Sequence, residues 1–472
     1  MGNDARQPLE ERGQNRSQRP TSDEFLAYMG AGWDDRPSAI PDALPVAPFA
    51  AARRAKLAER FAGQLVAVAA GPSPVRSNDT EYRYRPHSAF AHLTGWGVHS
   101  VPDSVLIIDA RGGASSAKSI LFFRETAGKG VREFFSNSLI GEFWVGKRPS
   151  LAEVAALLNI ETRSLTELDA FLEKNPADQT LADIDLVEFT SELRLVKDEY
   201  EIGEMKSAVA ATVKGFEAVA KMLPSAIGKP RSERMVEAAF FGQARIEGND
   251  IGYETIAASG SHACILHWII NDGELRDGEL LLLDAGVEVD SLYTADVTRT
   301  LPINGKFSPV QLEIYNAVLE AADAVFAMAK PGVTYKEMHA TAMRKVAEFT
   351  HAWGMLPGTV EESLDLKLQF HRRWMVHGTG HHLGLDVHDC AQARRETYHE
   401  AVLEPGMIFT IEPGLYFHAD DLLAPERFRG IGVRIEDDVL VSEDGVVNLS
   451  SALPRTAAEI ETWMATLQGR NS

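Results

Sequence analysis

The sequence predicts an α/β (α+β) protein of two domains, and three observations support this prediction. The chain has 472 residues, which is too long for one ordinary domain of roughly 100 to 200 residues. Strand-like and helix-like segments alternate over residues 45–188. From residue 189 onward, a pattern of two helices followed by strands occurs twice, without obvious repetition of the sequence itself.

The composition restricts the class of protein. It is 45% hydrophobic and 24% charged, and no apolar run is long enough to span a membrane. A net charge of -21 without a basic patch argues against nucleic-acid and membrane partners. The N-terminus has no apolar signal region, and Cys264 and Cys390 form no CxxC pair. These features predict a cytoplasmic protein in which any metal is held by oxygen and imidazole.

Residues 1–188 are expected to form a tail and then a domain of their own. Residues 1–44 are rich in Arg, Gln, Asn, Asp and Pro and predict a flexible tail or an arm that orders on assembly. The pattern then predicts a helix at 50–61, strands at 65–70, 104–110 and 119–123, and a helix at 151–158. We therefore expect an α/β domain over residues 45–188.

The two halves of region 189–472 are expected to resemble each other. The first has predicted helices at 197–223 and 233–247 and strands at 254–259 and 280–300. The second begins with Ser308-Pro309-Val310-Gln311, a capping box with proline at the first helical position, and Thr334 to Glu337 caps its next helix. Strands follow at 407–416 and 430–441. Two similar halves that face one another would leave a cleft between their sheets, which is a common place for a site.

Two aspartates flank the predicted hairpin of the first half. A buried strand, Glu279 to Gly286, ends near Asp284, and Asp296 follows twelve positions later. A hairpin would bring the two carboxylates together, and without a cation they would repel, so the pair requires a shared proton or a metal. Taken alone, each aspartate is more typical of a strand end or a turn.

Residues 377–389 contain four histidines, His377, His381, His382 and His388, interleaved with glycines that let the backbone approach a ligand closely. A lone histidine is usually a satisfied core or surface residue. This density instead favours metal binding or acid–base chemistry.

Two glutamates lie on the strands expected in the second half. The alternation of residues 407–412 places Glu412 at the end of a strand, just before Pro413-Gly414. In residues 430–438, Arg434, Glu436 and Asp438 share one face. In isolation this second segment is more typical of an edge strand whose polar face lies in water.

Taken together, the acids and one imidazole match two divalent metal ions per subunit. Carboxylate-rich, thiolate-free ligation favours Mn²⁺, with Co²⁺, Fe²⁺ or Zn²⁺ possible. Two such ions about 3.5 to 4 Å apart can bridge a water, lower its pKa toward neutrality and polarise a scissile carbonyl, so amide hydrolysis is the predicted reaction. The candidate carboxylate ligands are Asp284, Asp296, Glu412 and Glu436, with one of the four clustered histidines as the imidazole.

Motifs along the chain resemble those of aminopeptidase P, the Xaa-Pro aminopeptidases, which form the proline-directed branch of the pita-bread metallopeptidases. The resemblance implies a pseudo-symmetric pita-bread catalytic domain over residues 189–472 behind an aminopeptidase P-type domain. It also implies release of the N-terminal residue from peptides with proline in second position, through a hydroxide that bridges two metal ions. The matching motifs are Ser77 to Tyr82, Leu93-Thr94-Gly95, Glu192 to Lys197 and Arg434 to Asp438.

The resemblance also implies roles for individual residues. Asp284 would be a bidentate ligand, Asp296 and Glu436 would bridge the two ions, and His381 and Glu412 would complete the set.

Beyond ligation, Glu412 would handle the proton of the bridging water. His267 and His388 would orient substrate and stabilise the tetrahedral intermediate, while His377 and Arg434 would support the ligands and the proline-side pocket. Without the resemblance, His267 is more typical of a buried packing residue.

Two alternatives remain open from the sequence. Thr379-Gly380 before His381 is as similar to prolidase, which cleaves only Xaa-Pro dipeptides, as to aminopeptidase P. A non-catalytic peptide-binding module is the alternative from another class, although the complete ligand set argues against it. The expected partners are peptides with an N-terminal Xaa-Pro sequence, in a homodimer or homotetramer.

Overall fold

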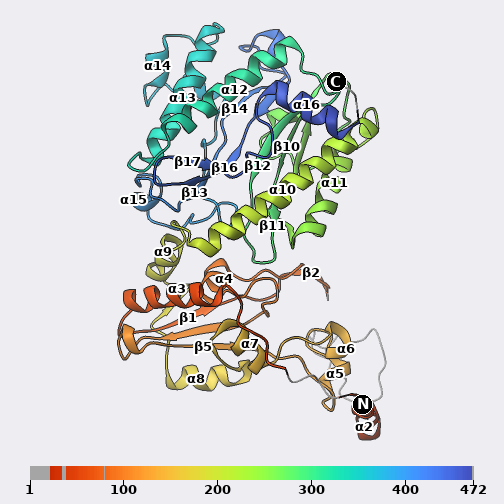
Figure 1. Cartoon of the computed structure of the whole chain (residues 1–472), viewed down its shortest axis with the longest axis vertical. Coiled ribbons are helices and arrows are strands. Elements are labelled where there is room, and N and C mark those ends of the chain that lie inside the picture. The colour runs from red at the N-terminus through yellow and green to blue at the C-terminus, as the bar shows by residue number, and fades with distance from the viewer. Residues whose placement is uncertain (1–21, 35–38, 79, 470–472) are drawn as a thin grey trace, which may run out of the picture. The chain divides into compact units, whose positions relative to one another are not determined.

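The computed structural model describes residues 22–34, 39–78 and 80–469. The chain forms two compact units, Met1–Val187 and Glu188–Ser472 (Figure 1). The tail expected over residues 1–44 lies partly outside the described residues. Within its described part, Asp23–Gly30 forms helix α2, whose N-cap Ser22 accepts a hydrogen bond from the backbone N–H of Phe25.

The N-terminal unit is built on a mixed sheet in the order β6-β5-β4-β1-β7. The central β4 is antiparallel to both of its neighbours, whereas β6 and β7 pair in parallel with the strands beside them. Leu65, Ile107 and Phe122 are fully buried on one face of this sheet. The strands are β1 (Leu65–Ala69), β4 (Val105–Asp109), β5 (Lys118–Phe123), β6 (Glu161–Ser164) and β7 (Gln179–Thr180), with a separate β2 (Val75–Ser77) and β3 (Thr80–Glu81) hairpin.

Helices surround this sheet close to where the sequence predicts them. The helix expected from residue 50 begins at Ala47, because Pro48 is well suited to a first helical turn. The helices are α3 (Ala47–Arg60), α4 (Ser88–Thr94), α5 (Glu133–Ser136), α6 (Glu142–Val145), α7 (Leu151–Leu158) and α8 (Leu168–Lys174), and α9 (Ile184–Glu192) leads into the second unit.

The first half of the C-terminal unit contains the predicted hairpin. Strand β10 pairs antiparallel with β12, and this register places Asp284 opposite Thr298. The helix expected from Lys197 begins two residues later, because Asp198 forms a capping box with Glu201. The elements are α10 (Glu199–Ala226), α11 (Ser232–Glu247), β8 (Asp250–Ile251), β9 (Ile256–Ser259), β10 (Leu280–Ala285), β11 (Val287–Glu288) and β12 (Val297–Pro302).

The second half repeats the order of two helices followed by strands. The capping boxes at Ser308 and Thr334 are confirmed. The strand expected over 430–441 is interrupted, because the backbone N–H groups of Ile435 and Glu436 bond to Pro413 O and Thr298 O and leave the ladder. The elements are α12 (Pro309–Met328), α13 (Tyr335–Ala352), α14 (Val360–Leu364), α15 (Arg395–Tyr398), β13 (Ile408–Ile411), β14 (Gly414–Phe417), β15 (Ile431–Arg434), β16 (Asp437–Val441), β17 (Val446–Asn448) and α16 (Ala457–Leu467).

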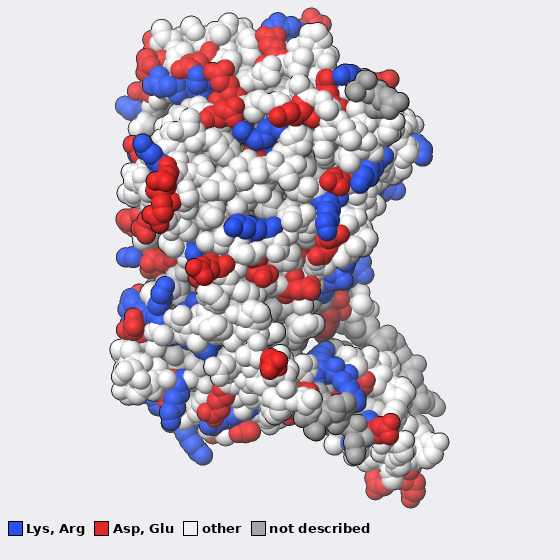
Figure 2. All heavy atoms as spheres, viewed as in Figure 1, with Lys and Arg blue, Asp and Glu red and all other residues white. Residues whose placement is uncertain are grey.

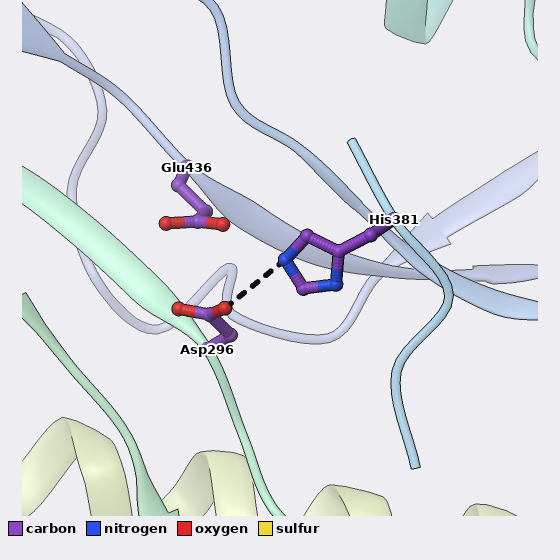
Figure 3. Close-up of side chains that lie close together, drawn as sticks. All are labelled: Asp296, His381 and Glu436. Atoms are coloured by element: carbon purple, nitrogen blue, oxygen red, sulfur yellow. Dashed lines mark ion pairs between the residues drawn. The ribbon is translucent and has the colours of Figure 1, made fainter. Parts of the chain in front are cut away.

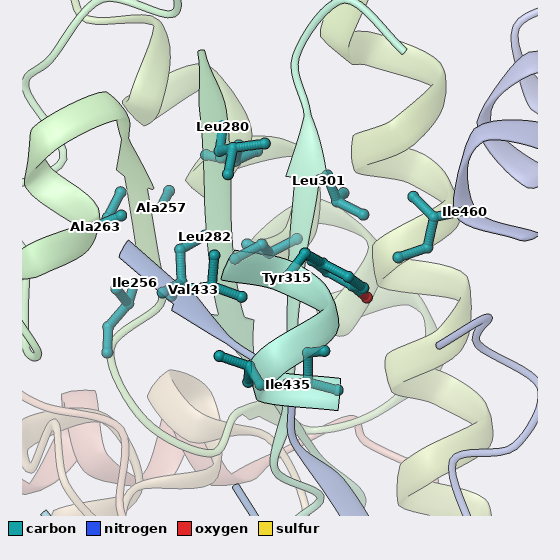
Figure 4. Close-up of a cluster of buried hydrophobic side chains, with 14 of the residues drawn as sticks. Ile256, Ala257, Ala263, Leu280, Leu282, Leu301, Tyr315, Val433, Ile435 and Ile460 are labelled. Atoms are coloured by element: carbon teal, nitrogen blue, oxygen red, sulfur yellow. The ribbon is translucent and has the colours of Figure 1, made fainter. Parts of the chain in front are cut away.

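One hydrophobic core joins the two halves of this unit (Figure 4). Leu282 of β10, Leu301 of β12, Tyr315 of α12, Val433 of β15 and Ile460 of α16 are each at most 1% exposed. Burial of a side chain of this size contributes roughly 1.5–3 kcal/mol. The core therefore fixes the strand ends that bear Asp284 and Arg434.

The surface mixes both signs of charge. Acidic and basic side chains are interspersed on the face shown in Figure 2. Among the helices of the described residues, none has the length and apolar character needed to cross a bilayer.

Candidate metal centre and active-site cavity

The two predicted aspartates lie together beside a tyrosine. Asp284 is in β10 and Asp296 directly precedes β12, and both side chains are buried. The hydroxyl oxygen of Tyr253 lies 2.7 Å from Asp284 Oδ1 and 2.5 Å from Asp296 Oδ1. A phenol has one proton, so Tyr253 donates to one carboxylate at a time. The Tyr253 hydroxyl therefore keeps the two carboxylates close to one another.

His381 and Glu436 approach the same place from the second half. Ligand atoms of Asp296, His381 and Glu436 all lie within 4.8 Å of one another, and their side chains point toward a common centre (Figure 3). His381 Nε2 is 3.2 Å from Asp296 Oδ2, and Thr298 donates to Glu436 Oε2 at 2.7 Å. Burial opposes protonation of His381, but Asp296 and Glu412 outweigh it and raise the pKa of His381 to about 9. In this position, a metal cation could take the place of the proton on the His381 imidazole.

The glycine before His381 is needed for this arrangement. The backbone N–H of Thr410 bonds to His381 O at 2.9 Å, so the histidine loop lies directly against β13. A Cβ at position 380 would come within 2.1 Å of Thr410 O. Only glycine allows the backbone approach that presents His381.

Glu412 follows β13 and faces two histidines. Its Oε1 lies 3.8 Å from His381 Nε2 and its Oε2 lies 3.5 Å from His377 Nδ1. Burial raises the pKa of Glu412 to about 7, against the opposing effects of His381 and Arg434. A carboxyl group with a pKa near neutrality can both accept and release a proton under ordinary conditions.

Arg434 contacts the other side of the cluster. Its guanidinium forms an ion pair with Asp284 and donates to Tyr416 Oη and Thr298 Oγ1, both at 3.1 Å. Tyr416 Oη lies 2.7 Å from His377 Nε2. His377 and Arg434 are therefore linked through one hydroxyl beside the carboxylates.

A further buried carboxylate, Asp438, supports the cluster from behind. Its Oδ2 accepts the backbone N–H of Asp296 at 3.1 Å, while its Oδ1 has no hydrogen-bond partner among the described residues. Burial and then the neighbouring Asp296 raise the pKa values of Glu436 and Asp438 well above their usual range. The buried carboxyl groups outnumber the one guanidinium beside them, so the cluster needs further positive charge. Oxygen donors with one imidazole suit divalent ions. The donor set fits the expected metal ions.

These side chains line a cavity of about 460 Å³. This volume lies within the usual range of roughly 300–1,000 Å³ for small-ligand sites. His267 and His388 are exposed within its lining, and the His388 ring lies edge-on to His381 with centroids 4.4 Å apart. His267 is therefore not in the buried packing position that would be typical of it without the resemblance. The cavity is also lined by Ile256, Leu266, Ile269 and Val387, together with all five candidate ligands, His377 and Arg434.

The structure also corrects one alternative and adds residues that the sequence did not single out. The segment with Glu436 is not an edge strand with its polar face in water, because Arg434, Glu436 and Asp438 are all at least 96% buried. Thr298 lies two positions after Asp296, so the period of two along a strand could have indicated it, as it did place Asp438 on the face of Glu436. Tyr253 has no such local signal.

Comparison with known proteins gives consistent matches along the chain. Residues 203–443 match metallopeptidase family M24, and residues 50–182 match the aminopeptidase P N-terminal domain. The chain is 49% identical to Xaa-Pro aminopeptidase 1 of Streptomyces coelicolor, over 95% of this chain and 93% of that protein. It is 32% identical to Xaa-Pro aminopeptidase of Escherichia coli, over 88% of this chain and 97% of that protein. Its fold is similar to that of E. coli aminopeptidase P with the inhibitor Pro-Leu, with a TM-score of 0.79, 29% identity and coverage of 90% and 100%.

Proposed function

The chain belongs to metallopeptidase family M24 and is a metal-dependent aminopeptidase, and from this premise we propose that it releases the N-terminal residue from peptides with proline in second position. The observation that supports this proposal most directly is the convergence of both halves on one cavity. Asp284 and Asp296 of the first half and His381, Glu412 and Glu436 of the second half all line it.

We propose these five side chains as the ligands of two divalent ions. Mn²⁺ is favoured by the carboxylate-rich set, with Co²⁺, Fe²⁺ or Zn²⁺ as alternatives. When bound, the ions would supply an activated water and polarise the scissile carbonyl. Arg434, which is paired with Asp284, limits the negative charge of the cluster on one side.

Glu412 is the proposed proton carrier. It lines the cavity beside His377 and His381, at 3.5 and 3.8 Å, where it can take a proton from the attacking water and deliver it to the leaving nitrogen. His388 is suited to donate a hydrogen bond as a neutral imidazole, because partial desolvation in the cavity wall and then the neighbouring His381 lower its pKa. We assign His267 and His388 to orienting the substrate and stabilising the charge that develops on its carbonyl oxygen.

Proline specificity has a physical basis in this cavity. The bond before proline has no N–H, so a peptidase that relies on that donor loses a contact. The apolar side chains of Ile256, Leu266, Ile269 and Val387 offer packing for a ring next to the polar centre. His377 and Arg434 are proposed to line the proline side.

The test compares peptides that differ only around proline. Metal-stripped protein would be supplied with Mn²⁺ and given Xaa-Pro-Xaa tripeptides, Xaa-Pro dipeptides and Xaa-Ala-Xaa tripeptides. We expect release of the first residue from Xaa-Pro-Xaa alone. Cleavage of the dipeptide alone would make the protein a prolidase, and no cleavage with any divalent ion would favour a peptide-binding module.

A matched pair of variants ties this activity to the metal centre. Asp296→Ala should lower kcat/KM on the order of a hundredfold or more, because a ligand of the cluster is lost. Asp290→Ala is the control, since Asp290 is an exposed residue at the turn of the same hairpin. Equal turnover by the two variants would contradict the ligand assignment.

We further propose a cytoplasmic homodimer or homotetramer. Both cysteines are free and buried, which fits a reducing compartment. Sedimentation velocity would distinguish the two assemblies from a monomer.

A further inference from the structure

The loop that presents His267 packs against the hydrophobic core through the partly buried side chains of Leu266 and Trp268, which lie on either side of that histidine. It connects β9 to β10, and His267 is exposed in the lining of the cavity. The nearby side chains of Ile265, Ile269 and Ile270 are exposed as well. A loop of this kind needs fixed polar contacts if it is to hold a side chain in one place.

Those contacts converge on one carboxylate of α11. Glu233 is 0% exposed, and its two oxygens accept from five groups of residues 259–273. The backbone N–H and hydroxyl of Ser259 lie 2.8 and 2.9 Å from Oε1, and His262 Nδ1 lies 2.8 Å from the same atom. Trp268 Nε1 donates to Oε2 at 2.8 Å, and the backbone N–H of Gly273 donates to it at 2.7 Å. Glu233 thus binds the beginning, the middle and the end of the loop.

The close approach of Glu233 depends on a glycine. A Cβ at position 273 would lie 2.7 Å from the carboxylate carbon of Glu233. Burial alone would raise the pKa of Glu233, but the bonds from Ser259, Trp268 and His262 lower it, so the side chain is ionised at neutral pH. Charge-assisted hydrogen bonds of this kind are stronger than those between neutral groups.

Trp268 transmits this anchoring to the neighbouring residue. Its indole stacks on the His262 ring, with centroids 3.9 Å apart and 27° between the planes, while its N–H is held by Glu233. The Trp268 side chain is therefore fixed on two sides. His267 is the adjacent residue in sequence, so its backbone position is constrained within one peptide unit.

We propose that Glu233, through Trp268 and His262, is a positioning residue that sets where His267 lies in the active-site cavity. This inference rests on the proposed function, in which His267 contacts the substrate. It assigns Glu233 no contact with the reacting atoms. Its effect on turnover is transmitted through the loop.

Trp268→Phe tests the inference by removing the indole N–H, and the Trp144→Phe control matches its loss of side-chain volume. The variant keeps an aromatic ring against His262 but loses the N–H that Glu233 accepts. We expect kcat/KM for Xaa-Pro-Xaa tripeptides to fall on the order of tenfold to a hundredfold, mainly through kcat, because a small misplacement of a reacting geometry has effects of this size. Bound metal, measured by plasma mass spectrometry, should be unchanged.

Trp144→Phe is the matched control. Trp144 also donates its indole N–H, to Phe135 O at 2.9 Å, but it lies in the N-terminal unit. This variant should retain wild-type kcat/KM. If Trp268→Phe retains it too, the inference is overturned.

A double-mutant cycle separates positioning from a general structural effect. In a His267→Ala background, Trp268→Phe should cause almost no further loss of kcat. Multiplicative losses would overturn the inference while leaving the proposed role of His267 intact. Full activity of His267→Ala alone would overturn both. If Trp268→Phe does not fold, Glu233→Gln takes its place in the same cycle, and the same outcomes support or overturn the inference.

Discussion

At the scale of single residues, Tyr253 organises the centre without being one of the proposed ligands. Its hydroxyl lies within 2.7 Å of both Asp284 and Asp296. Groups that orient metal ligands in this way typically affect metal affinity by about 10–100-fold. We therefore predict that Tyr253→Phe weakens Mn²⁺ binding roughly tenfold or more, measured by calorimetric titration of metal-stripped protein.

Tyr315→Phe provides the comparison for that variant. It also removes a buried tyrosine hydroxyl, which donates to Arg455 O at 2.6 Å, but its partner is no part of the metal centre. This change should lower stability and leave Mn²⁺ affinity as in the wild type. Equal affinities for Tyr253→Phe and Tyr315→Phe would show that Tyr253 does not orient the aspartates.

The contrast between Asp296 and Tyr253 shows which site residues a sequence can indicate. Asp296 is separated from Asp284 by a short hairpin, so local strand patterns predict that the two meet. The bonds of Tyr253 to these aspartates span 31 and 43 positions, and its own segment is irregular. Contacts of that kind depend on the packing of β8, β9 and β10 and leave no periodic signal.

At the scale of elements, the segment before α10 fixes the loop that follows the histidine cluster. Arg194 Nε and Lys197 Nζ lie 2.8 and 3.1 Å from the two oxygens of Asp389, and all three side chains are buried. Asp389 is adjacent to His388. The helix was expected to begin at Lys197, but the buried ammonium group lies outside it, and Asp198 provides the cap instead.

The Asp389 ion pairs predict an acid-dependent loss of stability. Burial opposes ionisation of Asp389, but Lys197 and Arg194 outweigh it and hold its pKa far below the ordinary value of 3.8. A depressed pKa in the folded state means that the stabilisation is complete above pH 3.8 and is lost as the pH falls below that value. The free energy of unfolding should therefore decrease steeply in that acidic range.

Asp389→Asn tests this prediction. It removes the carboxylate that Lys197 and Arg194 share and leaves Arg194 with the longer pair to Asp386 at 3.6 Å. The free energy of unfolding at pH 7 should therefore fall by roughly 3–5 kcal/mol, and its further decrease in acid should be shallower. Urea unfolding followed by circular dichroism at a series of pH values measures both effects. The exposed Asp420→Asn is the control. An acid dependence as steep as in the wild type would contradict the assignment.

Element boundaries were predictable where caps are local and less so where strands change partners. Ser308 and Thr334 were identified correctly because a capping box lies within four residues. The Ser22 cap of α2 is a similar signal that the expectation of a tail overlooked. The break at Ile435 and Glu436 depends on bonds to Pro413 and Thr298, so no local pattern could reveal it.

At the scale of the whole molecule, the proposed metal centre lies between two halves that the repeated order of two helices followed by strands had indicated. Each half contributes proposed ligands, Asp284 and Asp296 from the first and His381, Glu412 and Glu436 from the second, and the shared core of Leu282, Tyr315 and Val433 packs between the strands of both halves. The repeated order of elements predicts a cleft, because two similar halves that face one another leave a space between their sheets. The sequence could not indicate how close the acidic side chains of the two halves would lie, because their distances depend on how the strands pack.

The central claim is that this acidic cavity holds two divalent ions that are required for hydrolysis. The most direct measurement strips the protein with a chelator, restores Mn²⁺ stepwise, and follows bound metal and tripeptide cleavage together. We predict no cleavage without metal and full activity at two ions per chain. Full activity in protein that retains one ion per chain or fewer would contradict the account.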